Sequence, residues 1–183
     1  MPRKIQEIVD LISNDRQSLL RSVSGLSEAQ LDYRPAADQW SISDLLHHLA
    51  LADEANVKLS SMMLKQAQEK DLPLDRMPEE SVLDCLDRFA PTLQNNKMTA
   101  PERVAPKSHL PASESLARLT ASREKLLAVI TQLGQYELSQ VKFPHPLLGE
   151  LNTYQWMVLA GGHERRHTAQ IGRIKSQAEF PTS

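Results

Sequence analysis

Two histidines near the C-terminus, His163 and His167, have the residue type and the spacing to form a chemical site. Residues four positions apart on an α-helix lie within about 40° of each other, one turn along the same face. This spacing lets two imidazole rings reach one divalent metal ion from a single rigid helix. Because two ionisable rings directed into a core need partners, a shared metal ion would satisfy both.

The hydrophobic pattern around these histidines predicts the helix face that they occupy. Apolar residues recur at spacings of three and four, and both histidines fall on that apolar stripe. Its apolar members are Trp156, Leu159, Ala160, Ile171 and Ile174. Glu164, Arg165 and Arg166 fall on the opposite side, so we expect them to be exposed to solvent.

A third ligand should come from another helix, and the second predicted helix contains His47 and His48. Adjacent helical residues point about 100° apart, so only one of the two can readily join the site. His48 lies one turn from Leu45 and Ala52 and fits the apolar stripe better, but the pattern does not exclude His47. Asp44, four residues before His48, could accept the second ring proton of a metal-bound His48.

Other residues with reactive side chains have simpler interpretations. His109 and His145 lie in proline-flanked loop segments without a paired ligand, and we expect them to be structural or exposed. Gln170 lies one turn beyond His167. Its side chain would either form a hydrogen bond near the site or only pack against its neighbours, and the pattern favours neither. Cys85 is the single cysteine, in an apolar segment, and is interpreted as a core residue. One cysteine excludes an internal disulfide and suits a reducing cytoplasm.

The segment from His163 to His167 also matches His-Glu-x-x-His, the helix of zinc peptidases in which the glutamate is the general base. A peptidase of that kind needs a third ligand downstream and an edge strand to hold an extended substrate. Only 16 residues follow His167, and none is a histidine. A hydrolase of this type is therefore the less favoured hypothesis, and Glu164 is expected to lie outside the chemistry.

Composition narrows the class of protein. A chain of 183 residues fits one domain, residues 1–183. Aromatic content is only 4%, and Leu and Ala are abundant beside Val and Ile, which favours helices over sheets. A net charge of −2 gives no electrostatic reason to expect nucleic acid. The sequence has no apolar run near 18 residues, so we expect no membrane span.

Four long amphipathic helices must position the site. They are predicted over roughly 3–24, 41–68, 113–134 and 152–177. The second begins at Ser41, where Asp44 gives the spacing of a capping box, and Gly134 should end the third. Because no segment is a convincing strand, the sequence predicts an all-α four-helix bundle.

The connection between the second and third helices is long. Residues 69–111 contain six prolines, which allow one short helix at about 79–89 and little other regular structure. We expect this crossover to lie over one end of the bundle as a pocket wall. Residues 143–151 are predicted to be an extended or turn connection.

Two segments resemble a known family, the DinB/YfiT-like superfamily. The segment from Trp40 to Leu49 is similar to the Trp-Ser-x-x-Glu-x-Leu-x-His-Leu start of that family's second helix. Residues 145–152, then Trp156 and the histidine pair with Gln170, are similar to its C-terminal signature. The resemblance covers nearly the whole chain.

The resemblance implies a bundle with an up-down-down-up arrangement and three histidine ligands to one divalent metal ion. Carried onto this sequence, the ligands are His48, His163 and His167, with His47 as a neighbour. Asp44 stands where the family usually has glutamate. Imidazole suits zinc, nickel and iron alike, so the metal stays open.

The resemblance also implies an activity. Family members with known activity join low-molecular-weight thiols to electrophiles, or are related isomerases. Three neutral imidazoles leave an open coordination position, which is typical of a catalytic zinc site. We therefore expect a metal-dependent thiol S-transferase whose partners are a small-molecule thiol and an electrophile, in a cytoplasmic homodimer.

The alternative is a metal-binding stress or binding protein without catalysis. An open pocket above the metal would favour the enzyme, and a closed site the binding protein.

Overall fold

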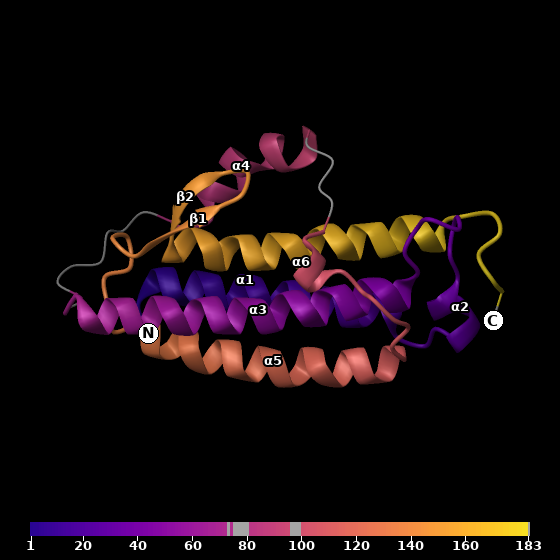
Figure 1. Ribbon diagram of the computed structural model, residues 1–183, viewed down its shortest axis with the longest axis horizontal. Coiled ribbons are helices and arrows are strands. Elements are labelled where there is room, and N and C mark those ends of the chain that lie inside the picture. Colours follow the sequence, from indigo (N-terminus) through magenta and orange to yellow (C-terminus); the bar gives the residue numbers. More distant parts are fainter. Residues whose placement is uncertain (73, 75–80, 96–99, 183) are drawn as a thin grey trace.

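The computed structural model describes residues 1–72, 74, 81–95 and 100–182. Four long helices lie side by side along the longest axis of the molecule (Figure 1). They are α1 (Arg3–Val23), α3 (Ile42–Glu69), α5 (Ala112–Leu133) and α6 (Thr153–Lys175). These bounds agree with the predicted helices to within about two residues. The predicted all-α four-helix bundle is confirmed.

Local sequence signals explain where the main helices begin and end. At the start of α3, the Ser41 hydroxyl accepts from the Asp44 amide, and the Asp44 carboxylate accepts from the Ser41 amide at 2.9 Å. Asn152 and Gln155 form the same reciprocal box at the start of α6. Each box satisfies two N–H groups that a helix start would otherwise leave unpaired. Helix α5 ends at Leu133, just before Gly134, as predicted.

The helix directions follow from pairs of contacts at different levels of the bundle. Near the start of both helices, the Lys4 ammonium of α1 lies 5.1 Å from the centre of the Tyr154 ring of α6. Near their ends, Lys175 donates to the Ser22 carbonyl. Helices α1 and α6 are therefore parallel.

Helices α3 and α5 form the second parallel pair. Arg118 pairs with Glu54 at 2.8 Å, and farther along both helices Ser60 and Ile130 line one small cavity. These two helices run opposite to α1 and α6, as the colour order in Figure 1 also shows. The up-down-down-up arrangement is confirmed.

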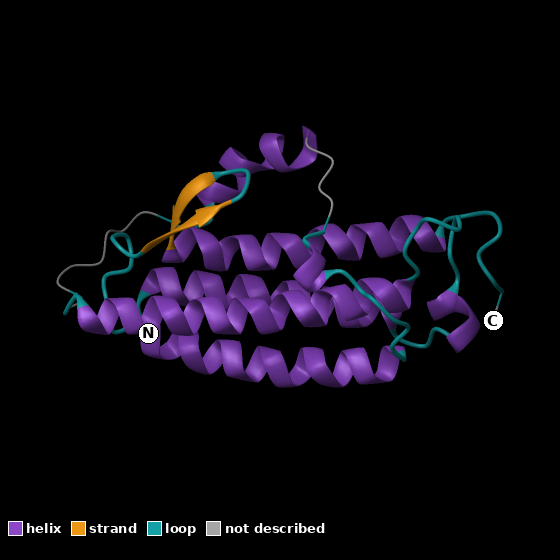
Figure 2. Cartoon of the chain, in the orientation of Figure 1, coloured by secondary structure: helices purple, strands orange, loops and turns teal. Residues whose placement is uncertain are grey.

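Shorter elements cover the bundle. Helix α2 (Glu28–Asp32) lies between α1 and α3, while α4 (Asp84–Asn95) and the 3-10 turn η1 (Glu102–Val104) belong to the crossover. Helix α4 packs on α6, where Leu86 faces Gly162 (Figure 2). Two corrections arise here: the described helix begins at Asp84, not near 79, and continues past Pro91. Residues 79 and 80 lie outside the described part.

The connection before α6 is more regular than predicted. Strands β1 (Lys142–His145) and β2 (Gly149–Asn152) form a two-stranded antiparallel hairpin, with Phe143 opposite Leu151. Gly149 has a φ of 72° and supplies the left-handed residue of the turn. The expectation that no strand forms was therefore wrong for this segment.

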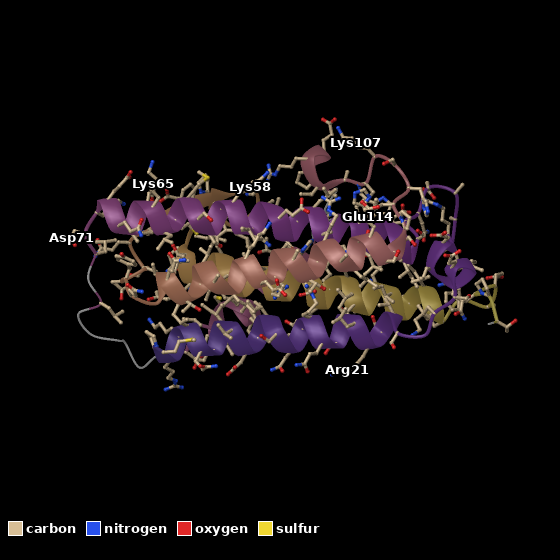
Figure 3. All side chains as sticks on the ribbon, turned by 90° about the horizontal axis from the view of Figure 1, so that it is seen from below. Arg21, Lys58, Lys65, Asp71, Lys107 and Glu114 are labelled. Atoms are coloured by element: carbon tan, nitrogen blue, oxygen red, sulfur yellow. The ribbon has the colours of Figure 1, made fainter. Side chains whose placement is uncertain are left out.

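Charged side chains cover the outside of the bundle. Figure 3 shows Arg21, Lys58 and Lys65 directed away from the helices. Among the described residues, no helix has both the length and the apolar character needed to cross a bilayer.

Candidate metal centre

The structure brings three histidines of two helices together: His48 of α3, and His163 and His167 of α6. The Nε2 atom of His163 lies 3.1 Å from Nε2 of His48 and 3.1 Å from Nε2 of His167. All three donor atoms lie within 4.8 Å of one another. In a tetrahedral zinc site with Zn–N of about 2.0–2.1 Å, neighbouring ligand nitrogens are roughly 3.3 Å apart. The two distances to His163 are therefore close to those between neighbouring ligands of a metal site.

His48, rather than His47, belongs to this group. Both side chains are buried, but His47 is not part of the cluster of possible ligands. Its buried Nδ1 atom has no hydrogen-bond partner among the described residues. The 100° turn between adjacent helical residues separates the two rings, as the helical geometry predicts.

Hydrogen bonds fix the protonation of two of the rings. His48 Nδ1 lies 2.8 Å from the carbonyl oxygen of Val104, and His167 Nδ1 lies 3.0 Å from Oε1 of Gln170. Because these oxygens only accept, each Nδ1 carries the proton in the neutral ring, and the lone pair is on Nε2. Both lone pairs face His163 Nε2, which can donate to only one of them. A cation between the three nitrogens would satisfy all of them, so the residues fit a metal ion.

The predicted role of Asp44 was wrong. Its carboxylate accepts from Ser41 and pairs with Arg34 at 2.7 Å, while the backbone of Val104 accepts the His48 proton. Asp44 is the third residue of α3, so its side chain folds back to the helix start instead of reaching along the helix to His48.

Burial keeps the three rings neutral near pH 7. Loss of hydration lowers the pKa of His167 to about 4 and holds the pKa of His163 well below its ordinary value of 6.5. Burial also lowers the pKa of His48. The positive charge of Arg166 acts in the same direction on all three rings. Neutral rings keep their lone pairs available for a metal ion.

A cavity of about 490 Å³ opens over the three histidines. Ala100, Pro101 and Val104 of the crossover form one wall, which confirms that this segment borders a pocket. The expectation that it lies over one end of the bundle was wrong, because η1 lies midway along the long helices (Figure 1). Other lining residues are Asp38, Gln39, Trp40, Ala52, Arg166 and Gln170. The Trp40 ring lies 5.0 Å from the His48 ring, centre to centre. The cavity is therefore lined by apolar side chains, such as Trp40 and Pro101, and by polar ones, such as Arg166 and Gln170.

Glu164 is buried, contrary to the expectation that it faces solvent. Its side chain is 3% exposed and accepts from Arg16 of α1 and from Arg123 of α5, the latter at 2.8 Å. Both carboxylate oxygens are thus bonded to guanidinium groups. The expectation was wrong because Glu164 lies where α6 packs against α1 and α5, whose arginines bind its carboxylate.

The remaining reactive residues lie where the sequence predicts. His109 is exposed, and His145 lies in the hairpin with its ring 5.1 Å from the Trp156 ring. Cys85 is buried, which raises its pKa to about 11. Arg165 and Arg166 are exposed.

The acceptor of the His48 proton and the partners of Glu164 were not predicted from the sequence. The acceptor is a backbone carbonyl, which no residue type reveals. For the partners a signal exists: Arg16 follows Ile12 by one turn, and Arg123 follows Leu119 by one turn, so both occupy positions of the apolar stripes.

The fold and the site define a class: a four-helix bundle with three histidines directed into a pocket. Residues 11–171 match the family model of the DinB superfamily. The chain therefore belongs to the DinB superfamily.

The chain is also similar to individual proteins. The uncharacterized protein YuaE of Bacillus subtilis (strain 168) is 32% identical over 172 residues, which cover 93% of this chain and 99% of that protein. A protein of Geobacillus kaustophilus (strain HTA426), named "Putative metal-dependent hydrolase GK0616", is 21% identical over 95% of this chain and 85% of its own length. The crystal structure of TT2238, a four-helix bundle protein, superposes with a TM-score of 0.55 at 22% identity, covering 91% of this chain and 96% of that one. This last likeness concerns the fold.

Proposed function

We propose that the protein binds one divalent metal ion through the Nε2 atoms of His48, His163 and His167. The observation that supports this most strongly is the convergence of three neutral-ring nitrogens, two of them with their Nδ1 protons already given to acceptors. The name of the Geobacillus relative, which contains the words metal-dependent, agrees with the proposal.

We further propose that the protein is a metal-dependent thiol S-transferase acting on a small electrophile. A divalent ion held by these three neutral ligands would keep its full charge and would lower the pKa of a thiol or water at the open position. The positive charge of Arg166 borders the cavity and favours an anionic nucleophile there. Trp40, Ala100 and Pro101 offer an apolar wall for the electrophile. In the transfer, the thiolate sulfur forms a bond to the electrophilic carbon as that carbon releases its leaving group.

Metal-dependent hydrolysis is the second candidate, because the Geobacillus relative carries that name. The same open position would then hold water in place of a thiol. Glu164 is not available as a general base for this reaction, since both of its oxygens accept from arginines. A non-catalytic binding protein receives less support, because the cavity over the histidines is open.

The two reactions can be separated with one set of proteins. We expect wild-type protein loaded with Zn²⁺, Ni²⁺ or Fe²⁺ to form thiol conjugates from a panel of cellular thiols and a small alkylating electrophile. His167→Ala protein should lose the conjugation, and His109→Ala protein, altered at an exposed histidine outside the site, should keep it. Hydrolysis of ester and amide substrates without any thiol would instead favour the hydrolase. Equal conjugation by His167→Ala and wild-type protein would contradict the transferase site.

A further inference from the structure

A cluster of four buried charges lies beside the three histidines. Its members are Arg16 of α1, Asp53 of α3, Arg123 of α5 and Glu164 of α6, each with a side chain no more than 10% exposed. We propose that Glu164 is a positioning residue for the metal ligands, acting through the two arginines on Asp53. This proposal rests on the proposed metal binding and adds a role for the glutamate of the His-Glu-x-x-His segment.

Arg16 connects three helices from the α1 side. Its Nε donates to Oε1 of Glu164, and its Nη2 donates to Oδ2 of Asp53 at 3.2 Å. Its Nη1 donates to the backbone carbonyl of Leu119 in α5 at 2.6 Å. All three nitrogens of the guanidinium group are therefore used, and α1 is fixed against α3, α5 and α6 at one level.

Arg123 makes the matching connection from the α5 side. Its Nη2 lies 2.8 Å from Oε2 of Glu164 and 3.4 Å from Oδ1 of Asp53. Its Nη1 donates to the carbonyl of Ile12 in α1 at 2.9 Å. Ser122 adds a bond of 2.7 Å to Oδ2 of Asp53. With two arginines and two carboxylates, the cluster has no formal net charge.

The cluster sets the distance between the two helices that hold the histidines. Helix α3 carries both Asp53 and His48, and α6 carries both Glu164 and His163. The two carboxylates are joined through guanidinium groups that contact both of them. His163, Asp53 and Glu164 also border one small cavity, so the charges lie directly beside the ligand. The separation of α3 and α6 at this level determines how far His48 Nε2 lies from His163 Nε2.

Stability alone is a weak reason to bury these charges. Removing ions from water is costly, and apolar residues of similar volume often serve a core equally well. Arg123 Nε even lacks a partner among the described residues. The planar guanidinium groups instead hold the carboxylates of Asp53 and Glu164 at fixed positions. Metal affinity depends on supporting contacts of this kind around the ligands.

The test compares metal affinity with stability. Zn²⁺ affinity is measured on metal-free protein by competition with a chelator, and the free energy of unfolding is measured on the same samples. Glu164→Gln keeps the side-chain shape but leaves an arginine charge unpaired, and we expect it to weaken Zn²⁺ binding about tenfold to a hundredfold. Leu133→Ala, which removes a buried side chain at the far end of α5, is the control for loss of stability.

Arg123→Lys is the second variant, in case Glu164→Gln does not fold. It keeps the charge but cannot reach both carboxylates, so weaker Zn²⁺ binding is again expected. The absorption spectrum of bound Co²⁺ should change in both variants and stay unchanged in Leu133→Ala, because it reports ligand geometry. Wild-type affinity and spectrum in whichever of the two variants fold, or an equal loss of affinity in Leu133→Ala, would overturn the proposal. Wild-type protein that binds no metal would overturn the proposed function, and this proposal with it.

Discussion

At the scale of single residues, the site depends on which nitrogen of each histidine carries a proton. Val104 and Gln170 accept the Nδ1 protons of His48 and His167, so the two Nε2 lone pairs are directed at one point. Burial keeps the rings neutral by lowering their pKa values. His48 and His167 are thus neutral at pH 7 with the Nε2 lone pair of each already directed at His163.

This burial predicts how stability depends on pH in the metal-free protein. The pKa of His167 is about 4 in the folded state, and its ordinary value is 6.5. Between these values the unfolded chain binds a proton that the folded chain does not, so the free energy of unfolding falls as pH drops from about 6.5 to about 4. Comparison with His167→Gln by urea unfolding should attribute roughly 3 kcal/mol of that fall to His167. The same pH dependence in both proteins would contradict the prediction.

Cys85 provides a separate check on the core. Burial raises its pKa to about 11, and the thiol donates to the Val82 carbonyl. We expect almost no reaction with a thiol reagent at about pH 8 in folded protein, and full reaction after unfolding, because the thiolate is the reactive form. Rapid labelling of the native protein would show that α4 does not hold Cys85 buried in the core as described.

Single residues also mark the limit of prediction from sequence. The histidine pair and His48 could be found because helical periodicity directs them to one stripe. The arginines on the apolar stripes of α1 and α5 are a signal of buried charge, but their pairing with Glu164 could not be predicted, because the three residues come from helices far apart in the sequence. Neither could the acceptor of His48, which is a carbonyl of the crossover. The prediction for Asp44 rested on its spacing from His48 alone. In the structure the Asp44 carboxylate instead accepts from the Ser41 amide in the capping box.

At the scale of elements, the close approach of α1 and α6 is what allows the charge cluster to form. Gly161 makes this possible: a Cβ atom there would lie 3.0 Å from Cγ of Leu11 and 3.2 Å from Oδ2 of Asp15. Asp15 in turn pairs with Arg165. The helix bounds themselves were predictable from capping residues and periodicity, whereas this packing distance and the β-hairpin depend on tertiary contacts.

Two glycines of α6 form a matched pair for testing this contact. Gly161→Ala should lower the free energy of unfolding by about 1–3 kcal/mol, because the new methyl group overpacks the interface with α1. Gly172→Ala meets nothing within 4 Å, so it should raise that free energy by about 0.5–1 kcal/mol through helix propensity. Chemical denaturation of both variants tests the prediction. Stabilisation by Gly161→Ala would mean that the helices are not closely packed there.

At the scale of the whole molecule, the up-down-down-up order explains where the pocket lies. Because α3 and α5 are parallel, the chain must return along the bundle between them, and α4 of this crossover lies over α6 (Figure 1). Its η1 turn brings the Val104 carbonyl to His48 and forms one wall of the cavity. One connection therefore both orients a proposed ligand and shapes the space above it.

The central claim is that three particular histidines hold one metal ion. Metal content after loading and desalting tests it most directly, with elemental analysis of wild-type protein and single alanine variants. The account predicts about one ion per chain in wild-type protein and in His47→Ala, whose ring lies outside the group. It predicts a large loss in His48→Ala, His163→Ala and His167→Ala. No bound metal in wild-type protein, or a full equivalent in His48→Ala together with a loss in His47→Ala, would contradict it.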